Sequence, residues 1–75
     1  MAKYDPLAVR LSAAPRPIEL TFDEIDQLVG GLPAPAVTWR PWWANDATHV
    51  QARAWLGAGR SVESVDIARR RVVFR

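Results

Sequence analysis

The chain contains 75 residues, has no cysteine and carries a formal net charge of +2. This length allows one small domain, here residues 1–75, and the lack of cysteine excludes a disulfide scaffold and the common cysteine-based zinc sites. No stretch has the length and hydrophobicity of a signal core or a membrane span. We therefore expect a soluble cytoplasmic protein, associated with the nucleoid if it binds DNA.

The charge is distributed unevenly along the chain. Residues 1–38 contain three basic and five acidic side chains, whereas residues 39–75 contain seven arginines and three acidic side chains. Arginine makes bidentate contacts with phosphate and guanine, so the bias in the second half fits a nucleic-acid surface. Codon preference in a GC-rich genome would give the same bias without any function, and the many alanines and prolines favour that alternative.

The first part of the chain predicts two helices separated by a short strand. An Asp-Pro pair begins a helix over 6–13, which two prolines end, and alternating residues predict a strand at 18–20. Thr21 and Glu24 have the spacing of a capping box. The hydrophobic stripe that follows them predicts a helix over 21–29, ended by a Gly-Gly pair. The acidic side chains of this helix are interpreted as a solvated face.

The segment 39–56 contains all four tryptophans of the chain. Before it, residues 32–37 can hold one helical turn, and the bulky rings that follow predict an ordered loop. An asparagine, an aspartate or Thr48 can cap the next helix, and Thr48 and Gln51 have the spacing of a second capping box. This helix is predicted over 47–57, with most of its surface buried.

Residues 60–75 predict a two-stranded hairpin. The hydrophobic positions of the first strand change phase between Val62 and Val65, which predicts a bulge. The second strand is expected at 72–74, and residues 68–71 form a basic tip between the two strands.

The expected elements follow the order helix, strand, helix, helical turn and loop, helix, hairpin. This order predicts an α+β fold, specifically a small winged helix-turn-helix-like domain. The segment between the two main helices has roughly 15 residues, which is longer than the usual short turn. The recognition helix is therefore either the turn near 33–40 or the helix over 47–57.

Several groups of residues occur together along nearly the whole chain. They are Lys3-Tyr4-Asp5-Pro6-Leu7, Leu20-Thr21-Phe22-x-x-Ile25, Gly30-Gly31-Leu32-Pro33, Trp42-Trp43-x-Asn45-x-x-x-His49-x-Gln51-Ala52-x-Ala54-Trp55, Gly59-x-x-Val62-x-x-Val65-Asp66 and Val72-x-Phe74. This pattern resembles an uncharacterised family of small, winged-helix-like bacterial and phage domains, found alone or joined to nuclease-like domains. The resemblance implies work on DNA and brings no established activity or site residues.

Trp42 and Trp43 are adjacent, so both rings cannot enter one core if the backbone is extended. At least one is expected in the core, because a small domain needs the apolar area that a tryptophan buries. The other ring could stack on a base or rest against Arg40.

The polar residues near the tryptophans have structural and functional interpretations. His49 has no second histidine, cysteine or nucleophile to work with, so a structural or hydrogen-bonding role is favoured over metal binding or catalysis. Asn45 is interpreted as a capping or loop residue. With Gln51, it could equally contact adenine edges if the start of this helix faces a DNA groove.

The basic tip also has two interpretations. Arg69, Arg70 and Arg71 would keep an ordinary hairpin soluble, or they would act as a wing that contacts phosphates or enters a minor groove. With Arg40 and the other arginines of the second half, they could neutralise several phosphates, which predicts salt-sensitive binding.

The favoured hypothesis is a non-enzymatic protein that binds double-stranded DNA, needs no cofactor or metal and serves in transcription regulation. The arginines would contact phosphates, and the polar residues near the tryptophans would contact bases. The candidate contact residues are Arg40, Trp43, Asn45, Thr48, His49, Gln51, Arg53, Arg60, Arg69, Arg70 and Arg71. The alternative is a phage or bacterial adaptor that binds a protein partner, or a second copy, through exposed tryptophans. An enzyme would need paired carboxylates, a cysteine nucleophile or a metal cluster.

Overall fold

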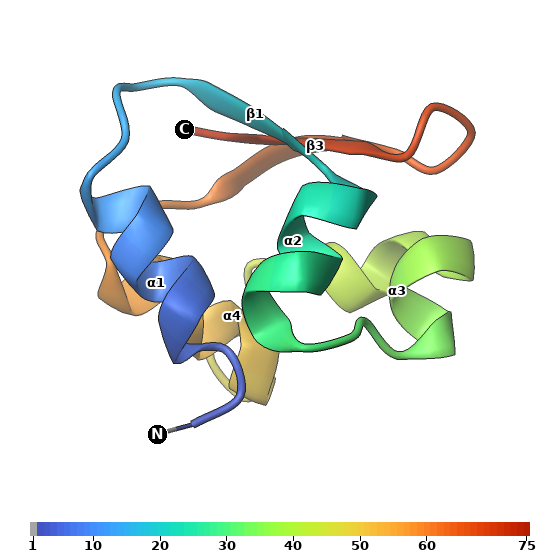
Figure 1. Ribbon diagram of the computed structural model, residues 1–75, viewed down its shortest axis with the longest axis horizontal. Coiled ribbons are helices and arrows are strands. Elements are labelled where there is room, and N and C mark those ends of the chain that lie inside the picture. Colours follow the sequence, from blue (N-terminus) through green and yellow to red (C-terminus); the bar gives the residue numbers. More distant parts are fainter. Residues whose placement is uncertain (1) are drawn as a thin grey trace.

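The computed structural model describes residues 2–75, whose helices lie against one face of a three-stranded antiparallel sheet (Figure 1). In chain order the elements are α1 (Asp5–Ser12), β1 (Ile18–Thr21), α2 (Phe22–Val29), α3 (Ala34–Thr38), the 3-10 helix η1 (Arg40–Trp43), α4 (Val50–Gly57), β2 (Val62–Asp66) and β3 (Arg71–Phe74). The predicted α+β class is confirmed at this level.

The sheet has the order β1-β3-β2, so the last strand of the chain is the central one. Val72 pairs with Leu20 on one side and with Val65 on the other, and all three side chains are buried beneath the helices. The register of the β2–β3 hairpin shifts between Val62 and Ser64, which confirms the predicted bulge. Because strand side chains alternate between faces, the same pattern also directs Phe74 into the core.

α2 begins with the predicted capping box. The Thr21 hydroxyl accepts a hydrogen bond from the Glu24 amide at 3.1 Å, and the Glu24 carboxylate accepts one from the Thr21 amide at 3.1 Å. Gly30 ends the helix in the left-handed conformation with φ of 74°. The helix predicted over 21–29 is therefore confirmed, with Thr21 as its N-cap.

Replacing Thr21 with alanine is expected to lower the free energy of unfolding by about 1 kcal/mol, because the Glu24 amide at the start of α2 loses the hydroxyl oxygen that accepts its hydrogen bond. Thr38→Ala is the matched control. The Thr38 hydroxyl donates only to the Ala34 carbonyl of its own helix, so its loss should change stability little. Denaturant unfolding measures both variants, and equal losses would contradict a specific capping role for Thr21.

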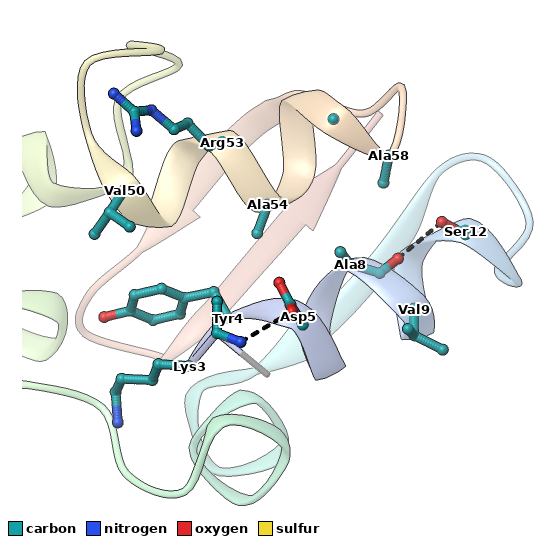
Figure 2. Close-up of a pocket in the computed structure, with 12 residues that line it drawn as sticks. Lys3, Tyr4, Asp5, Ala8, Val9, Ser12, Val50, Arg53, Ala54 and Ala58 are labelled. Atoms are coloured by element: carbon teal, nitrogen blue, oxygen red, sulfur yellow. Dashed lines mark hydrogen bonds between the residues drawn. The ribbon is translucent and has the colours of Figure 1, made fainter.

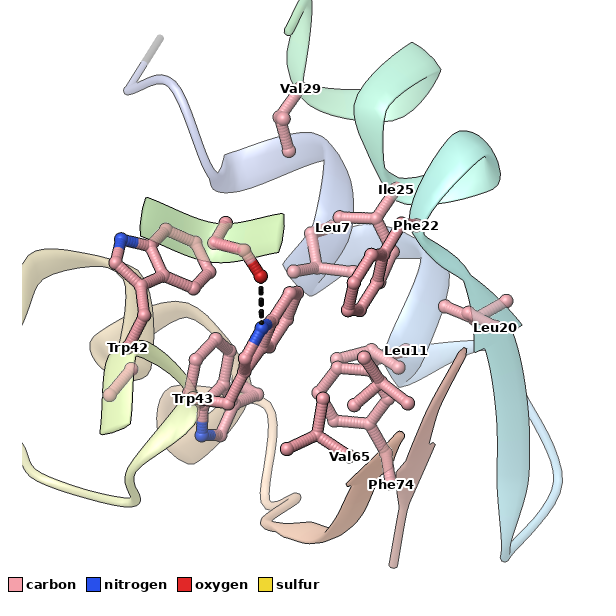
Figure 3. Packing of buried hydrophobic residues seen from close by; sticks show 14 residues of the cluster. Leu7, Leu11, Leu20, Phe22, Ile25, Val29, Trp42, Trp43, Val65 and Phe74 are labelled. Carbon is pink, nitrogen blue, oxygen red and sulfur yellow. Dashed lines mark hydrogen bonds between the residues drawn. The ribbon is translucent and has the colours of Figure 1, made fainter. Parts of the chain in front are cut away.

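Six of the seven aromatic rings are in contact with one another in a single cluster that runs through the core. Trp43 lies at the centre of the cluster. The ring pairs in contact are Tyr4–Trp42, Trp42–Trp43, Trp43–Phe22, Trp43–Trp55 and Trp55–Phe74. Figure 3 shows the adjacent Trp42 and Trp43 among the buried residues. Both rings are buried because 40–43 forms a 3-10 helix and not an extended backbone. The expectation that at least one of them lies in the core is confirmed. The seventh ring, Trp39, is 56% exposed.

The structure corrects the predicted start of the helix before the hairpin. α4 begins at Val50 with His49 as its N-cap, and no side chain caps it, so the second capping box was wrong. The reason is that the Asp46 carboxylate accepts hydrogen bonds from both the amide and the hydroxyl of Thr48, at 2.9 and 2.7 Å. Thr48 is thereby held in the turn before the helix. The hairpin tip is also shorter than predicted, because Arg71 already pairs within β3.

Candidate nucleic-acid interface

The tip of the β2–β3 hairpin is an ordered turn tied to the start of α2. The Arg69 amide donates to the Asp66 carboxylate at 3.0 Å, and the Arg70 amide donates to the Ile67 carbonyl at 3.2 Å. Arg70 has a positive φ of 58°, which reverses the chain direction. The Phe22 amide then donates to the Arg70 carbonyl at 2.9 Å. The tip is therefore fixed relative to α2 by a backbone hydrogen bond.

The arginines of the hairpin form ion pairs that solvent reaches. Arg70 lies 3.1 Å from Asp23 of α2, and Arg71 lies 3.3 Å from Glu19 of β1; every side chain in these two pairs is at least half exposed. The remaining tip arginine, Arg69, has a 79% exposed side chain. Exposed pairs of this kind contribute only about 0–1 kcal/mol to stability. A phosphate group can therefore compete with these carboxylates for the guanidinium groups.

A second exposed group lies where α3 meets η1. Trp39 joins these two elements, and its indole N–H has no acceptor within residues 2–75. Arg40 is exposed, and no carboxylate of the described residues lies within ion-pair distance of it. In Figure 1, α3 and the hairpin tip lie on the same side of the molecule, opposite α1. α3, which Trp39 directly follows, thus lies on the side to which the hairpin tip projects.

Arg60 cannot serve as a phosphate contact, contrary to the prediction. Its residue is 3% exposed, and four of its guanidinium hydrogen bonds go to backbone carbonyls. The acceptors are the carbonyls of Leu11, Ala14, Pro15 and Arg75, at 2.9 to 3.1 Å. Burial lowers the pKa of the Arg60 guanidinium from its usual value. The side chain joins the end of α1 to the end of β3.

Two further candidates hold the fold together. Trp43 is 2% exposed and donates its indole N–H to the Ala36 carbonyl at 2.8 Å (Figure 3). Gln51 is 8% exposed and donates to the Trp42 carbonyl at 3.0 Å. Because both side chains are buried, the prediction that they contact nucleic acid was wrong.

Although Asn45 is exposed, its side chain is hydrogen-bonded to the start of the hairpin. Its carbonyl oxygen accepts from the Trp55 indole at 2.9 Å and from the Val62 amide at 2.8 Å. Its amide nitrogen donates to the Val62 carbonyl at 2.9 Å. An adenine contact would break these bonds, so the structure favours the loop-bonding interpretation of Asn45.

The remaining candidates surround the start of α4. Hydrogen bonds from Thr48 lower the pKa of the Asp46 carboxyl group, which also lies 3.8 Å from His49 Nε2. His49 Nδ1 is buried and has no hydrogen-bond partner among the described residues. Arg53 is exposed, although its Nε donates to the Ala47 carbonyl at 2.8 Å. Of this group, Arg53 retains the most accessible donors.

The described part of the chain contains no cluster of metal-ligating side chains and no helix that could cross a membrane. Within residues 2–75, no three His, Asp or Glu side chains gather in a way that could hold a metal ion. The longest helices there have eight residues, whereas a bilayer span needs about 20.

Comparison with known proteins identifies a family. A family model described as "Domain of unknown function (DUF7662)" matches residues 4–75. The chain belongs to this family. The match confirms the expectation of an uncharacterised family of small domains. No curated protein and no solved structure matches the chain.

Sequence reasoning missed one accessible residue of this DUF7662 domain, namely Trp39. The pattern of adjacent rings drew attention to Trp43, which is buried, and left Trp39 without an assigned role. The available signal was weak: Trp39 precedes the Arg-Pro pair that begins η1, so its ring stands outside the turn that directs Trp42 and Trp43 inward. Trp39 is the exposed tryptophan, whereas the other three tryptophans are buried.

Proposed function

We propose that this chain is a non-enzymatic, winged-helix-like protein that binds double-stranded DNA. The order of helices and strands supports the proposal, because a helix, a strand, further helices and a C-terminal hairpin follow one another as in winged helix-turn-helix domains. Pairing of the final strand with β1 adds support, since it leaves the β2–β3 tip projecting as a wing. Work on DNA, in transcription regulation or beside nuclease-like domains, is the context that we propose.

The observation that carries the proposal is the exposure of four side chains with hydrogen-bond donors, Trp39, Arg40, Arg69 and Arg70, which we name the arginine corner. Arg40 has no carboxylate partner among the described residues, and the carboxylate partners of Arg69 and Arg70 are exposed. The Arg70 guanidinium also lies 5.7 Å from the centre of the Phe22 ring. Guanidinium groups donate to phosphate in bidentate geometry, and transfer of such a group from an exposed carboxylate to a phosphate costs little. The exposed Trp39 indole supplies a further N–H donor.

Base reading by α4 receives little support from its exposed face. This face consists of Val50, Arg53 and Gly57, of which only Arg53 has a polar side chain. Gln51 points inward, and Thr48 precedes the helix. The α3–η1 corner is therefore the better candidate for approaching the duplex, and the proposed binding depends mainly on phosphate contacts. Such binding has low sequence specificity and strong salt dependence.

Titration of labelled duplex DNA at several salt concentrations, followed by fluorescence anisotropy, tests the proposal. Arg40→Ala should weaken binding and reduce the slope of log affinity against log salt by about 1, and Arg69→Ala with Arg70→Ala should reduce it by about 2. Arg10→Ala is the matched control, because Arg10 is an exposed arginine of α1 and lies outside the arginine corner. It removes the same charge and should leave the slope near that of the parent protein.

Two results would overturn the proposal: no binding to duplex DNA at low salt, or an equal loss of affinity in Arg10→Ala and Arg40→Ala. The second candidate function is that of an adaptor for a protein partner. The 56% exposure of Trp39 favours it, because tryptophans frequently anchor protein interfaces. Absent DNA affinity together with a co-purifying partner that is lost in Trp39→Ala would favour the adaptor.

A further inference from the structure

Trp39 presents an aromatic ring from a fixed backbone. The Trp39 amide donates to the Pro35 carbonyl at 2.8 Å, and the Trp39 carbonyl accepts from the Trp42 amide at 3.0 Å. One bond belongs to the end of α3 and the other to the start of η1. Because both backbone groups are bonded, two helical turns fix the point from which the 56% exposed side chain projects.

The ring of Trp39 lies outside the hydrophobic core. It belongs neither to the buried cluster nor to the partly buried residues that pack against that cluster, and it stacks on no other ring of residues 2–75. Its indole N–H also has no acceptor within these residues. The ring therefore contributes little to the fold and keeps its exposed surface for a ligand.

A nucleotide suits the surroundings of this ring better than an apolar protein surface does. Tryptophans that anchor protein interfaces are surrounded by residues that exclude water. Trp39 is flanked in the chain by the exposed Thr38 and Arg40. The other large hydrophobic residues that are exposed, Val9 and Val50, line a different groove, between α1 and α4 (Figure 2). Trp39 is therefore an isolated aromatic group next to a cation, a combination that stacks bases and binds phosphates.

Arg40 lies at a groove between η1 and β2. The groove has a volume of about 390 Å³. This volume is within the range of about 300–1,000 Å³ that small-molecule sites have. Arg40 is exposed and has no ion-pair partner within residues 2–75. Its positive charge is therefore available to an anion that enters the groove.

The acidic side chain that lines this groove does not cancel the charge of Arg40. Glu63 of β2 accepts from the Arg75 guanidinium at 3.3 Å, so its carboxylate is already paired. Ser64 beside it is exposed and adds a hydroxyl group. Guanidinium groups bind phosphate through two parallel hydrogen bonds. The groove thus offers a phosphate group a cation and a hydroxyl donor.

We propose, on the basis of the function proposed above, that Trp39 and Arg40 bind an unpaired nucleotide of a DNA strand. The base stacks on the Trp39 indole, and the phosphate binds the Arg40 guanidinium at the groove between η1 and β2. The Cα atoms of adjacent residues are about 3.8 Å apart, so the two side chains can reach the two ends of one nucleotide. Within a duplex, neighbouring pairs cover both faces of a base, so a free face exists mainly in single-stranded or kinked DNA. The preferred DNA is therefore a duplex that continues into a single strand.

Fluorescence anisotropy with three labelled DNAs tests the stacking. They are a blunt duplex, the same duplex with a single-stranded thymidine overhang, and the same overhang built from abasic sugar phosphates. The thymidine overhang should bind the parent chain about tenfold more tightly than the abasic overhang, which keeps the phosphates but lacks the bases. The blunt duplex measures the proposed function separately.

Substitutions of Trp39 separate stacking from apolar contact. Trp39→Ala and Trp39→Leu should reduce the ratio of the two overhang affinities to about 1, because neither side chain has a ring. Trp39→Phe should retain part of the ratio. Val9→Ala is the matched control, because Val9 is 68% exposed but lies on α1, and its ratio should equal that of the parent chain.

Arg40→Ala tests the phosphate contact. It should weaken binding of the thymidine and abasic overhangs by the same factor, because both overhangs carry phosphates. A loss confined to the thymidine overhang would contradict the assignment of Arg40 to the phosphate.

Tryptophan fluorescence gives a direct readout of the ring. The other three tryptophans are buried, so an added base reaches Trp39. A single-stranded oligothymidylate should quench the emission of the parent chain, whereas an abasic strand should not. Trp39→Phe should lose this quenching.

Equal affinity of the parent chain for the thymidine and abasic overhangs overturns the nucleotide site, while binding to the blunt duplex leaves the proposed function intact. Absence of binding to the blunt duplex overturns the proposed function, while a preference for the thymidine overhang that depends on Trp39 supports the nucleotide site. A preference that persists in Trp39→Ala overturns the site. So does a protein partner that is lost in Trp39→Ala when the parent chain shows no preference among the DNAs.

Discussion

Arg60→Ala should lower the free energy of unfolding by about 3–5 kcal/mol, the largest loss that we expect from a single polar side chain of this protein. The Arg60 guanidinium donates four hydrogen bonds to carbonyls at the end of α1 and the end of β3. Without it, buried carbonyl oxygens lose their donors and a cavity remains. A domain of this length has a total stability of only about 4–11 kcal/mol, so a large part of it depends on this residue.

Unfolding in guanidinium chloride, followed by tryptophan fluorescence, measures the loss of stability in Arg60→Ala. Arg60→Lys separates charge from geometry, because lysine keeps the positive charge but presents its donors from one point and cannot reach carbonyls on both sides. We expect the lysine variant to lose more than half as much stability as the alanine variant. Arg10→Ala provides the control for removal of an exposed arginine. A loss below 1 kcal/mol in Arg60→Ala would contradict the structural role.

Local sequence signals predicted those elements whose cause lies within a few residues. The capping box at Thr21 and Glu24 needs only neighbouring backbone and side-chain groups, and it is present as predicted. The same pattern failed at Thr48. The Thr48 amide donates to the Asp46 carboxylate, which is nearer and a stronger acceptor than the side chain of Gln51, and this bond holds Thr48 in a turn. A spacing rule describes the residues that can interact; competition between acceptors decides which of them do.

The candidate site was harder to predict because burial depends on contacts distant in sequence. Arg60 resembles the other arginines of the second half in composition, yet its acceptors Leu11 and Ala14 lie more than 40 positions away. Gln51 likewise bonds to the backbone of η1. Sequence reasoning thus identified the basic hairpin, but it could not distinguish exposed arginines from the one that holds α1 to the sheet.

The tryptophans illustrate the same limit with one residue type. Their size alone predicted that most of them would be in the core, and three of the four are buried. Which one remained outside depended on the 3-10 turn at 40–43, since this turn directs Trp42 and Trp43 inward and leaves Trp39 at its start. The functional hypothesis therefore moves from Trp43 to Trp39 for a structural reason.

Trp55→Ala is expected to lower the free energy of unfolding by about 3–5 kcal/mol, whereas Trp39→Ala should lower it by less than about 1 kcal/mol. The two substitutions remove the same atoms from opposite environments, since Trp55 is fully buried and Trp39 is 56% exposed. Trp55 lies between Trp43 and Phe74, with ring centroids 5.8 Å away on each side, so its removal breaks the aromatic cluster and leaves a large cavity. Calorimetry of both variants measures the difference.

Trp55→Phe separates the ring from its hydrogen bond. Phenylalanine keeps much of the apolar volume, but it leaves the Asn45 carbonyl oxygen with only the Val62 amide as donor. We expect a loss of about 1–3 kcal/mol, smaller than in Trp55→Ala. In the Asn45→Ala background the same change should be less destabilising, because the indole N–H already lacks its acceptor; a double-mutant cycle measures this coupling. Additive losses would mean that Trp55 supports the hairpin by packing alone, whereas coupling would mean that one hydrogen bond from the core to Asn45 fixes where β2 begins.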